Sequence, residues 1–96
     1  MVGKKKKETK KLLNETQELL ELGKFYFVNQ KFDQAIKEFI RVLDQEPDNT
    51  DATYNMAVAY EAANNIEQAK IYYERTIELD PKNESAKTKL AKIVGE

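Results

Sequence analysis

A repeat of 34 residues is the feature that most restricts how this 96-residue chain can fold. When the sequence is shifted against itself by 34 residues, identical and similar residues align without a gap. The identical pairs are Thr16–Thr50, Tyr26–Tyr60, Gln34–Gln68, Ala35–Ala69, Arg41–Arg75, Pro47–Pro81 and Asn49–Asn83. The match continues into a partial third unit, where Ala52 aligns with Ala86 and Met56 with Leu90. A period of this length predicts stacked copies of one unit that bury each other's apolar faces.

Each unit is predicted to be a pair of helices. Ala52, Met56 and Tyr60 recur at intervals of four residues, and apolar residues between Phe32 and Leu43 recur at intervals of three and four. These intervals place the side chains on one face of a helix. The pattern predicts helices over approximately residues 8–29, 31–45, 50–63, 65–79 and 84–94.

Asparagine and proline residues mark the predicted helix ends. Pro47 and Pro81 have no N–H group and disfavour helix at the residue before them, so each is expected to follow the end of a second helix. Asn49 and Asn83 come next, and their side-chain oxygens can cap the helix that follows. Asparagine also tolerates the left-handed conformation. The turns inside the two helix pairs are therefore expected at Asn29-Gln30 and Asn64-Asn65.

Small residues predict close contacts between helices. Gly23 and Ala57 occupy the same position in the two units, in the middle of a predicted helix. Glycine costs a helix about 1 kcal/mol relative to alanine, so its presence there indicates a close neighbour. Ala35 and Ala69 are the predicted small residues on the facing helices.

The repeated residues resemble the pattern of the tetratricopeptide repeat family. That pattern is met in the first unit by Leu22-Gly23, Tyr26, Ala35, Phe39 and Pro47, and in the second by Met56-Ala57, Tyr60, Ala69, Tyr73 and Pro81. The resemblance covers about residues 16–83 as two repeats, and residues 84–94 are similar to the additional helix that often closes such arrays. It implies an all-α fold, a right-handed superhelical stack of antiparallel helix hairpins with about five helices.

The expected organisation has four parts. They are a basic N-terminal segment at 1–11 that is frayed or starts the first helix, repeat 1 at 12–49, repeat 2 at 50–83 and a capping helix at 84–96. Two repeats are fewer than the three usually needed for stability. A long first helix, a homodimer through that helix, or a place within a longer array would each compensate. The dimer hypothesis rests on leucines and aromatic residues spaced by seven, namely Leu12, Leu19 and Tyr26, and Leu13, Leu20 and Phe27.

Charge is distributed unevenly along the chain, although the net charge is only −1. Residues 1–11 have a net charge of +5, and residues 12–83 have a net charge of −7. The Lys4–Lys11 segment could attract nucleic acid or another acidic surface. No arginine or aromatic residue is interleaved with these lysines, as it usually is in specific nucleic-acid readers. A solvated terminus is therefore the simpler interpretation, and an adaptor for acidic surfaces is the alternative.

Composition argues against catalysis and cofactor binding. The chain has no cysteine and no histidine, which excludes disulfides, thiolate metal sites and the commonest general base. Asp44, Glu46, Asp48 and Asp51 lie close together, but without the glycine that a calcium loop needs, so an acidic turn is expected. No apolar run approaches the ~20 residues of a membrane span. We therefore expect a cytoplasmic protein that is not an enzyme and has no cofactor, metal, small-molecule substrate or membrane span.

The resemblance implies a protein-interaction module, an adaptor or scaffold that binds a protein or peptide ligand. Members of the family generally bind an extended or helical segment in a concave groove lined by the first helices of the repeats. The groove positions that the resemblance implies here are Leu20, Lys24, Phe27, Val28, Tyr54, Asn55, Val58, Glu61 and Lys89. Several of these residues are unusually apolar for a surface that faces water, which favours a ligand site.

One subclass of the family holds the C-terminal carboxylate of heat-shock chaperones with lysines, arginine and asparagines. Of the groove positions that this subclass uses, only Asn55 matches. Leu20 and Ser85 replace lysines, and Lys89 replaces the arginine, whose planar fork binds a carboxylate through two hydrogen bonds. We therefore expect no binding of such chaperone tails. For other ligands, a groove of two repeats predicts a Kd on the order of micromolar.

Overall fold

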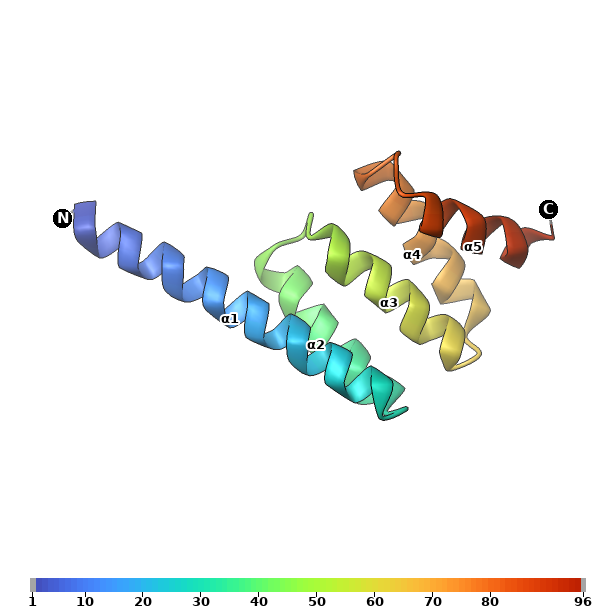
Figure 1. Ribbon diagram of the computed structural model, residues 1–96, viewed down its shortest axis with the longest axis horizontal. Coiled ribbons are helices and arrows are strands. Elements are labelled where there is room, and N and C mark those ends of the chain that lie inside the picture. Colours follow the sequence, from blue (N-terminus) through green and yellow to red (C-terminus); the bar gives the residue numbers. More distant parts are fainter. Residues whose placement is uncertain (1, 96) are drawn as a thin grey trace.

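The computed structural model describes the backbone of residues 2–95 and the side chains of residues 15–95. In this part of the chain there are five helices and no strand (Figure 1). The helices are α1 (Val2–Val28), α2 (Phe32–Gln45), α3 (Thr50–Ala62), α4 (Ile66–Leu79) and α5 (Glu84–Val94). Every predicted helix end is confirmed to within one residue except the start of the first helix. The lysine-rich segment is continuous with α1, which begins six residues earlier than expected.

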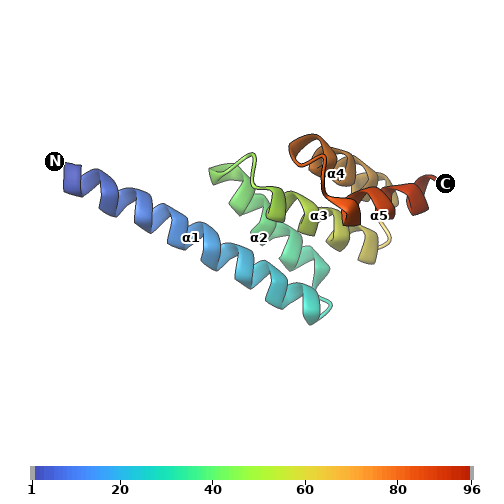
Figure 2. The same ribbon diagram turned by 45° about the horizontal axis from the view of Figure 1, so that its top comes forward.

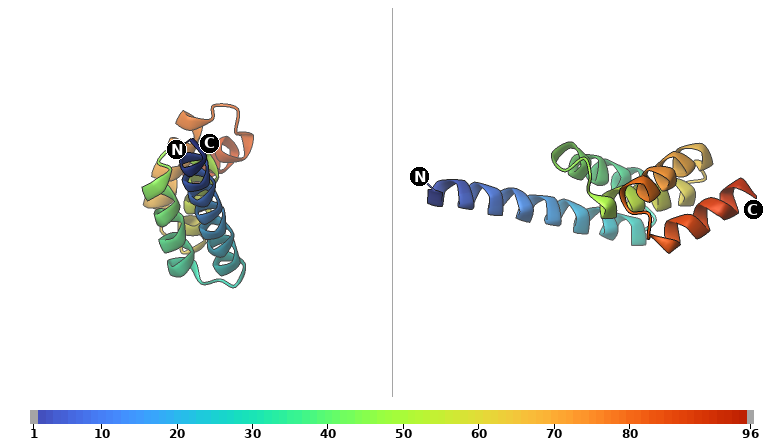
Figure 3. Two further views of the ribbon diagram at one scale, coloured as in Figure 1. Left: turned by 90° about the vertical axis from the view of Figure 1, so that its left-hand side faces the viewer. Right: turned by 90° about the horizontal axis from the view of Figure 1, so that it is seen from above.

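The helices form two antiparallel hairpins and a closing helix. Hairpin α1–α2 packs on hairpin α3–α4 mainly through α2 and α3, and α5 packs on α4. The first helices α1, α3 and α5 lie in front in Figure 1, with α2 and α4 behind them. The view from above in Figure 3 likewise places α1 and α5 on one side and α2 and α4 on the other.

The N-terminal half of α1 extends away from the rest of the stack (Figure 2). This projection makes the molecule long and thin, with extents of 54 × 29 × 16 Å. Leu12 and Leu13, on which the dimer hypothesis depends, lie outside the side chains that the structure describes.

Asparagine caps begin three of the helices. The side chains of Asn49 and Asn83 each accept a hydrogen bond of 2.9 Å from the backbone N–H three residues later, at the starts of α3 and α5. Asn65 makes the same bond at the start of α4, at 3.4 Å. These bonds satisfy N–H groups that have no partner inside the helix. The predicted caps at Asn49 and Asn83 are confirmed.

The turns inside the two hairpins share one geometry. Gln30 and Asn64 adopt the left-handed conformation, with φ of 62° and 64°. In each turn the next residue donates its N–H to the carbonyl five residues back, at 2.9 and 2.8 Å, which is a common way to end a helix. Both turns lie where predicted, but the left-handed residue is an asparagine in the second hairpin only and a glutamine in the first. There the bond pattern places Gln30 in the left-handed position, and the Asn29 side chain donates to the Phe25 carbonyl at 2.8 Å.

Two clusters of buried residues form the core. The first joins α1, α2 and α3 and contains Leu20, Ala35, Ile36, Phe39, Val42, Ala52, Met56 and Ala59. The second joins α3, α4 and α5 and contains Ala57, Ala69, Tyr73 and Ala86. Tyr60 and Tyr72 contact both clusters, and their rings stack with centroids 5.6 Å apart. The two hairpins are therefore joined by continuous packing.

Gly23 lies against the aromatic ring of Phe39. A Cβ placed at Gly23 would overlap the ring, with two ring carbons at 2.8 and 2.9 Å. The prediction of a close neighbour is thus confirmed at Gly23, but that neighbour is Phe39. Ala35, the predicted facing residue, is buried in the same cluster. The large ring fills the space that the missing side chain leaves.

Candidate functional site

The residues predicted to bind a ligand all lie on α1, α3 and α5. We call the side of the stack formed by these three helices the first-helix face (Figure 1). Along this face the side chains differ widely in exposure, so the predicted set does not form one uniform surface.

Leu20 is the predicted groove residue that the structure corrects. Only 4% of its surface is exposed, because its side chain packs into the first core cluster with residues of α2 and α3. A ligand on the first-helix face would find little of Leu20 to contact. Its place in the groove set was wrong, and its role is to hold the first hairpin together.

Four apolar residues of the predicted set remain on the first-helix face. Val28, at the end of α1, is 73% exposed. Phe27, Tyr54 and Val58 are half-buried, with Phe27 against the first core cluster and the other two against the second. The Phe27 ring also contacts the Phe32 ring at a centroid distance of 5.5 Å. These three side chains are held in place by the core and still offer part of their surface to a ligand.

Glu61 is tied to the core by a short hydrogen bond. The hydroxyl of the fully buried Tyr73 donates to the Glu61 carboxylate at 2.6 Å, and the Tyr54 ring meets the Tyr73 ring edge-on at 6.0 Å. Burial raises the pKa of Tyr73 above its ordinary value of 10.0, and the hydrogen bond to Glu61 raises that pKa further. The sequence had indicated Glu61 only as a groove residue. Its bond to Tyr73, twelve positions later on another helix, has no local sequence signal.

The polar residues of the predicted set lie at separate places on the face. Lys24 on α1 forms an exposed ion pair with Glu21, with Nζ 3.6 Å from the carboxylate oxygen. Asn55 on α3 is half-buried. Lys89 lines an open hollow of about 290 Å³ on α5 together with Glu84, Ser85, Thr88 and Lys92. Exposed ion pairs are worth about 0–1 kcal/mol, so Lys24 can exchange its partner for a ligand at little cost.

Replacing Tyr73 with phenylalanine should lower the free energy of unfolding by about 1–2 kcal/mol near neutral pH, because the hydrogen bond to a charged group is lost. In the wild type this contribution is present below pH 10.0 and falls at higher pH, because the unfolded tyrosine then loses its proton while the folded one keeps it. The difference between the two proteins should therefore shrink by up to about 1.4 kcal/mol per pH unit in that range. Urea denaturation at pH 7, 9, 10 and 11 measures it. A difference that stays constant would show that Tyr73 and Glu61 are not coupled as the structure indicates.

The described part of the chain, residues 2–95, contains neither a metal-binding cluster nor a membrane span. No group of three or more acidic side chains there has an arrangement that could hold a metal ion. No helix within it is both long enough and apolar enough to cross a bilayer.

A model of the family described as "Tetratricopeptide repeat" matches residues 19–93, which is most of the chain. The chain belongs to the tetratricopeptide repeat family. Domains of this family are protein-interaction modules. The predicted fold, an all-α solenoid of helix hairpins, and the predicted class of function are therefore both confirmed.

Known relatives match just over half of this tetratricopeptide repeat chain. The "FK506-binding protein-like" proteins of Mus musculus and Homo sapiens are each 39% identical to it over 54 residues, which is 56% of the chain. The match spans only 16% of the length of either relative.

Two solved structures are similar in fold. The tetratricopeptide repeat domain of Sgt2 from Aspergillus fumigatus has a TM-score of 0.78 at 26% identity, over 82% of this chain and 52% of that one. The first such domain of Spaghetti (RPAP3), solved with the HSP90 peptide SRMEEVD, has a TM-score of 0.50 at 25% identity, over 85% of this chain and 92% of that one.

A second hollow lies between α4 and α5, and the sequence had not indicated it. It has a volume of about 290 Å³ and is lined by Lys70, Glu74, Ile77, Lys87, Leu90, Ala91 and Val94. We call it the α4–α5 groove. The signal that could have revealed it is the repeat itself, because the 34-residue shift aligns Lys70 and Glu74 with Ile36 and Ile40. Charged residues replace apolar ones at these two positions.

Proposed function

We propose that this domain binds an extended or helical segment of a partner protein on its first-helix face. Val28, Phe27, Tyr54 and Val58 would provide the apolar contacts. The polar contacts would come from Lys24, Asn55, Glu61 and Lys89. The bound segment would contact α1, α3 and α5 together, which makes the domain an adaptor between its partner and any protein to which it is joined.

The observation that supports this proposal best is the exposure of apolar side chains on the first-helix face. Val28 is 73% exposed, and Phe27, Tyr54 and Val58 present part of their surfaces while the core fixes their other sides. Rigid, partly exposed aromatic and aliphatic residues are the usual anchors of protein interfaces. The related domain of RPAP3, whose structure contains a bound peptide, supports the same class of ligand.

The proposal excludes one group of peptides, the chaperone tails with a terminal carboxylate. Leu20 stands where such a clamp needs a lysine, and its burial in the core leaves no basic group at that point. Lys89 offers a point charge in place of the planar fork of arginine. We expect the peptide SRMEEVD, which the RPAP3 structure contains, to show no binding at micromolar concentration when it is titrated in a calorimeter. A micromolar Kd for this peptide would contradict the exclusion.

Selection from a random peptide library identifies a ligand, and two matched variants locate it. Val28→Glu places a charge on the first-helix face, whereas Ile71→Glu places one on an exposed apolar residue of α4. We expect Val28→Glu to raise the Kd of selected peptides at least about tenfold, because a carboxylate must then be buried against an apolar ligand. Ile71→Glu should leave the Kd unchanged. Equal effects of the two variants would contradict the proposal.

A third variant tests the alternative in which the basic segment is the binding element. The six lysines of residues 4–11 are replaced with glutamine, and binding is measured as the salt concentration rises. Binding through the lysines would fall steeply with salt, whereas apolar binding on the first-helix face should change little. Loss of binding in this variant alone would show that the basic segment, and not the first-helix face, binds the ligand.

We propose that residues 12–49 and 50–83 act as two repeats, that 84–96 closes the stack, and that the basic segment 1–11 is an extension of the first helix. We also propose a cytoplasmic protein without catalytic activity, on the basis of a composition that lacks histidine and cysteine.

A further inference from the structure

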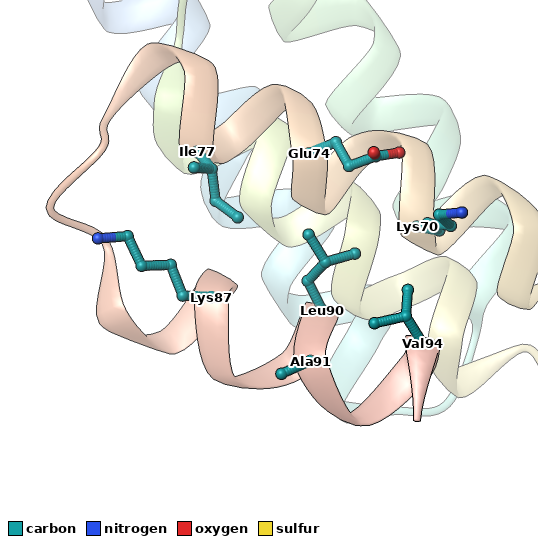
Figure 4. Close-up of a pocket in the computed structure, with 7 residues that line it drawn as sticks. All are labelled: Lys70, Glu74, Ile77, Lys87, Leu90, Ala91 and Val94. Atoms are coloured by element: carbon teal, nitrogen blue, oxygen red, sulfur yellow. The ribbon is translucent and has the colours of Figure 1, made fainter. Parts of the chain in front are cut away.

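The α4–α5 groove lies at the end of the stack, away from the first hairpin (Figure 1). Figure 4 shows Leu90 and Val94 pointing from α5 toward α4, and Ile77 pointing from α4 toward α5. These side chains and Ala91 form an apolar floor. Val94 is 44% exposed, and Leu90 and Ala91 are half-buried. The floor is thus only partly covered by the chain's own helices.

The internal repeat shows what fills the corresponding place one hairpin earlier. A shift of 34 residues aligns every residue of the groove with a residue of α2 or α3. Lys70, Glu74 and Ile77 correspond to Ile36, Ile40 and Leu43, and Lys87, Leu90, Ala91 and Val94 correspond to Thr53, Met56, Ala57 and Tyr60. The α4–α5 groove is therefore the structural equivalent of the crevice between α2 and α3.

One hairpin earlier, α4 packs on α3 beside this crevice. The Tyr72 side chain of α4 contacts the first core cluster, and its ring stacks on Tyr60 with an angle of 17° between the ring planes. Met56 and Ala57 are completely buried there, whereas their counterparts Leu90 and Ala91 are not. The groove is thus the less covered counterpart of the place where α4 packs, and α4 provides the template for what fits it.

Charge at the rim of the groove indicates the kind of helix. Lys70 projects from one wall and Lys87 from the other, and Glu74 is the single acid among the lining residues. Lys87 also forms an ion pair with Glu84, with Nζ 3.6 Å from the carboxylate oxygen, and an exposed pair of this kind can be exchanged at little cost. In the crevice between α2 and α3 the corresponding residues, Ile36, Ile40 and Thr53, are all uncharged. The charged rim with its net positive charge favours an occupant that has carboxylates along both edges of its apolar face.

We propose that the α4–α5 groove binds one amphipathic, acidic helix of a partner protein. The partner helix lies antiparallel to α5, as α4 lies against α3. It places an aromatic side chain over Leu90 and Val94, in the way that the Tyr72 ring stacks on Tyr60. Its carboxylates face Lys70 and Lys87. This site is separate from the first-helix face, so the domain can hold two partner segments at once.

The chain's own α4 sequence provides a probe. A fluorescent peptide with the sequence of residues 65–80 has four acidic and two basic side chains and contains the aromatic residue that the template requires. We expect it to bind the full chain with a Kd on the order of 100 μM, because one helix buries less surface than a standard interface. The same peptide with alanine at the position of Tyr72 should bind at least about tenfold more weakly. No detectable binding of the first peptide at millimolar concentration would overturn the proposal.

Variants of the full chain locate the bound peptide. Val94→Glu at the end of α5, and Lys70→Glu combined with Lys87→Glu, alter exposed side chains and should leave folding intact by circular dichroism. Each should raise the Kd at least about tenfold. Lys82→Glu reverses a lysine outside the groove, and Val28→Glu alters the first-helix face, so both should bind the peptide as the wild type does. Binding that is insensitive to Val94→Glu and to the double reversal would overturn the proposal.

Sedimentation equilibrium separates a partner helix from a second copy of the chain. The proposal predicts a monomer at the concentrations of the binding assay. A dimer that Val94→Glu dissociates and Lys82→Glu does not would show that a second copy occupies the groove, and would overturn the assignment to a partner protein.

Discussion

Replacing Phe39 with alanine is expected to lower the free energy of unfolding by about 3–5 kcal/mol. The ring is buried in the first core cluster and fills the space over Gly23, so its removal leaves a cavity beside a residue that has no side chain. Domains of this size have a total stability of about 5–15 kcal/mol. The variant should therefore be partly unfolded at room temperature when a low concentration of urea is present, as measured by far-ultraviolet circular dichroism.

A matched control separates this effect from the loss of any aromatic ring. Phe25 lies in the same hairpin but is 60% exposed, so Phe25→Ala should change the stability by about 0.5 kcal/mol or less. A loss below about 1 kcal/mol in Phe39→Ala would mean that the helices close over the cavity and that the contact with Gly23 is not a fixed part of the core.

Replacing Gly23 with alanine should lower the free energy of unfolding by about 1–3 kcal/mol. In an open helix the same change would raise stability by about 1 kcal/mol, because alanine is the better helix former. Here the added methyl group overlaps the Phe39 ring, which is only 1% exposed, so the ring or one of the helices must shift. Overpacking therefore outweighs helix propensity. Urea denaturation of the single variant measures the balance.

The double variant provides the decisive comparison. Once Phe39→Ala has removed the ring, Gly23→Ala should raise stability by up to about 1 kcal/mol, so the sign of its effect reverses. The equivalent position of the second hairpin supplies a control. Ala57 is fully buried without such an overlap, so Ala57→Gly should lower stability. The same destabilising effect of Gly23→Ala with and without the Phe39 ring would show that the ring is not its cause.

The candidate binding residues show where prediction from the sequence succeeded and where it did not. The 34-residue period identified α1, α3 and α5 as equivalent helices, and all nine residues lie on them. It did not distinguish Leu20 from Val28. Both are apolar residues of α1, yet one is 4% exposed and the other 73%. Their exposure depends on how closely α2 and α3 approach α1, and that distance cannot be predicted from the local sequence pattern of α1.

The sequence by itself determined the helices and their ends. Helical periodicity, the backbone limits of Pro47 and Pro81, and the caps at Asn49 and Asn83 all act within about four residues, so they can be recognised without knowledge of the fold. Only the tertiary structure placed the Phe39 ring on Gly23 and joined the Tyr73 hydroxyl to Glu61. It also left the floor of the α4–α5 groove partly open. These features arise between residues on different helices, where the packing of whole side chains sets each distance.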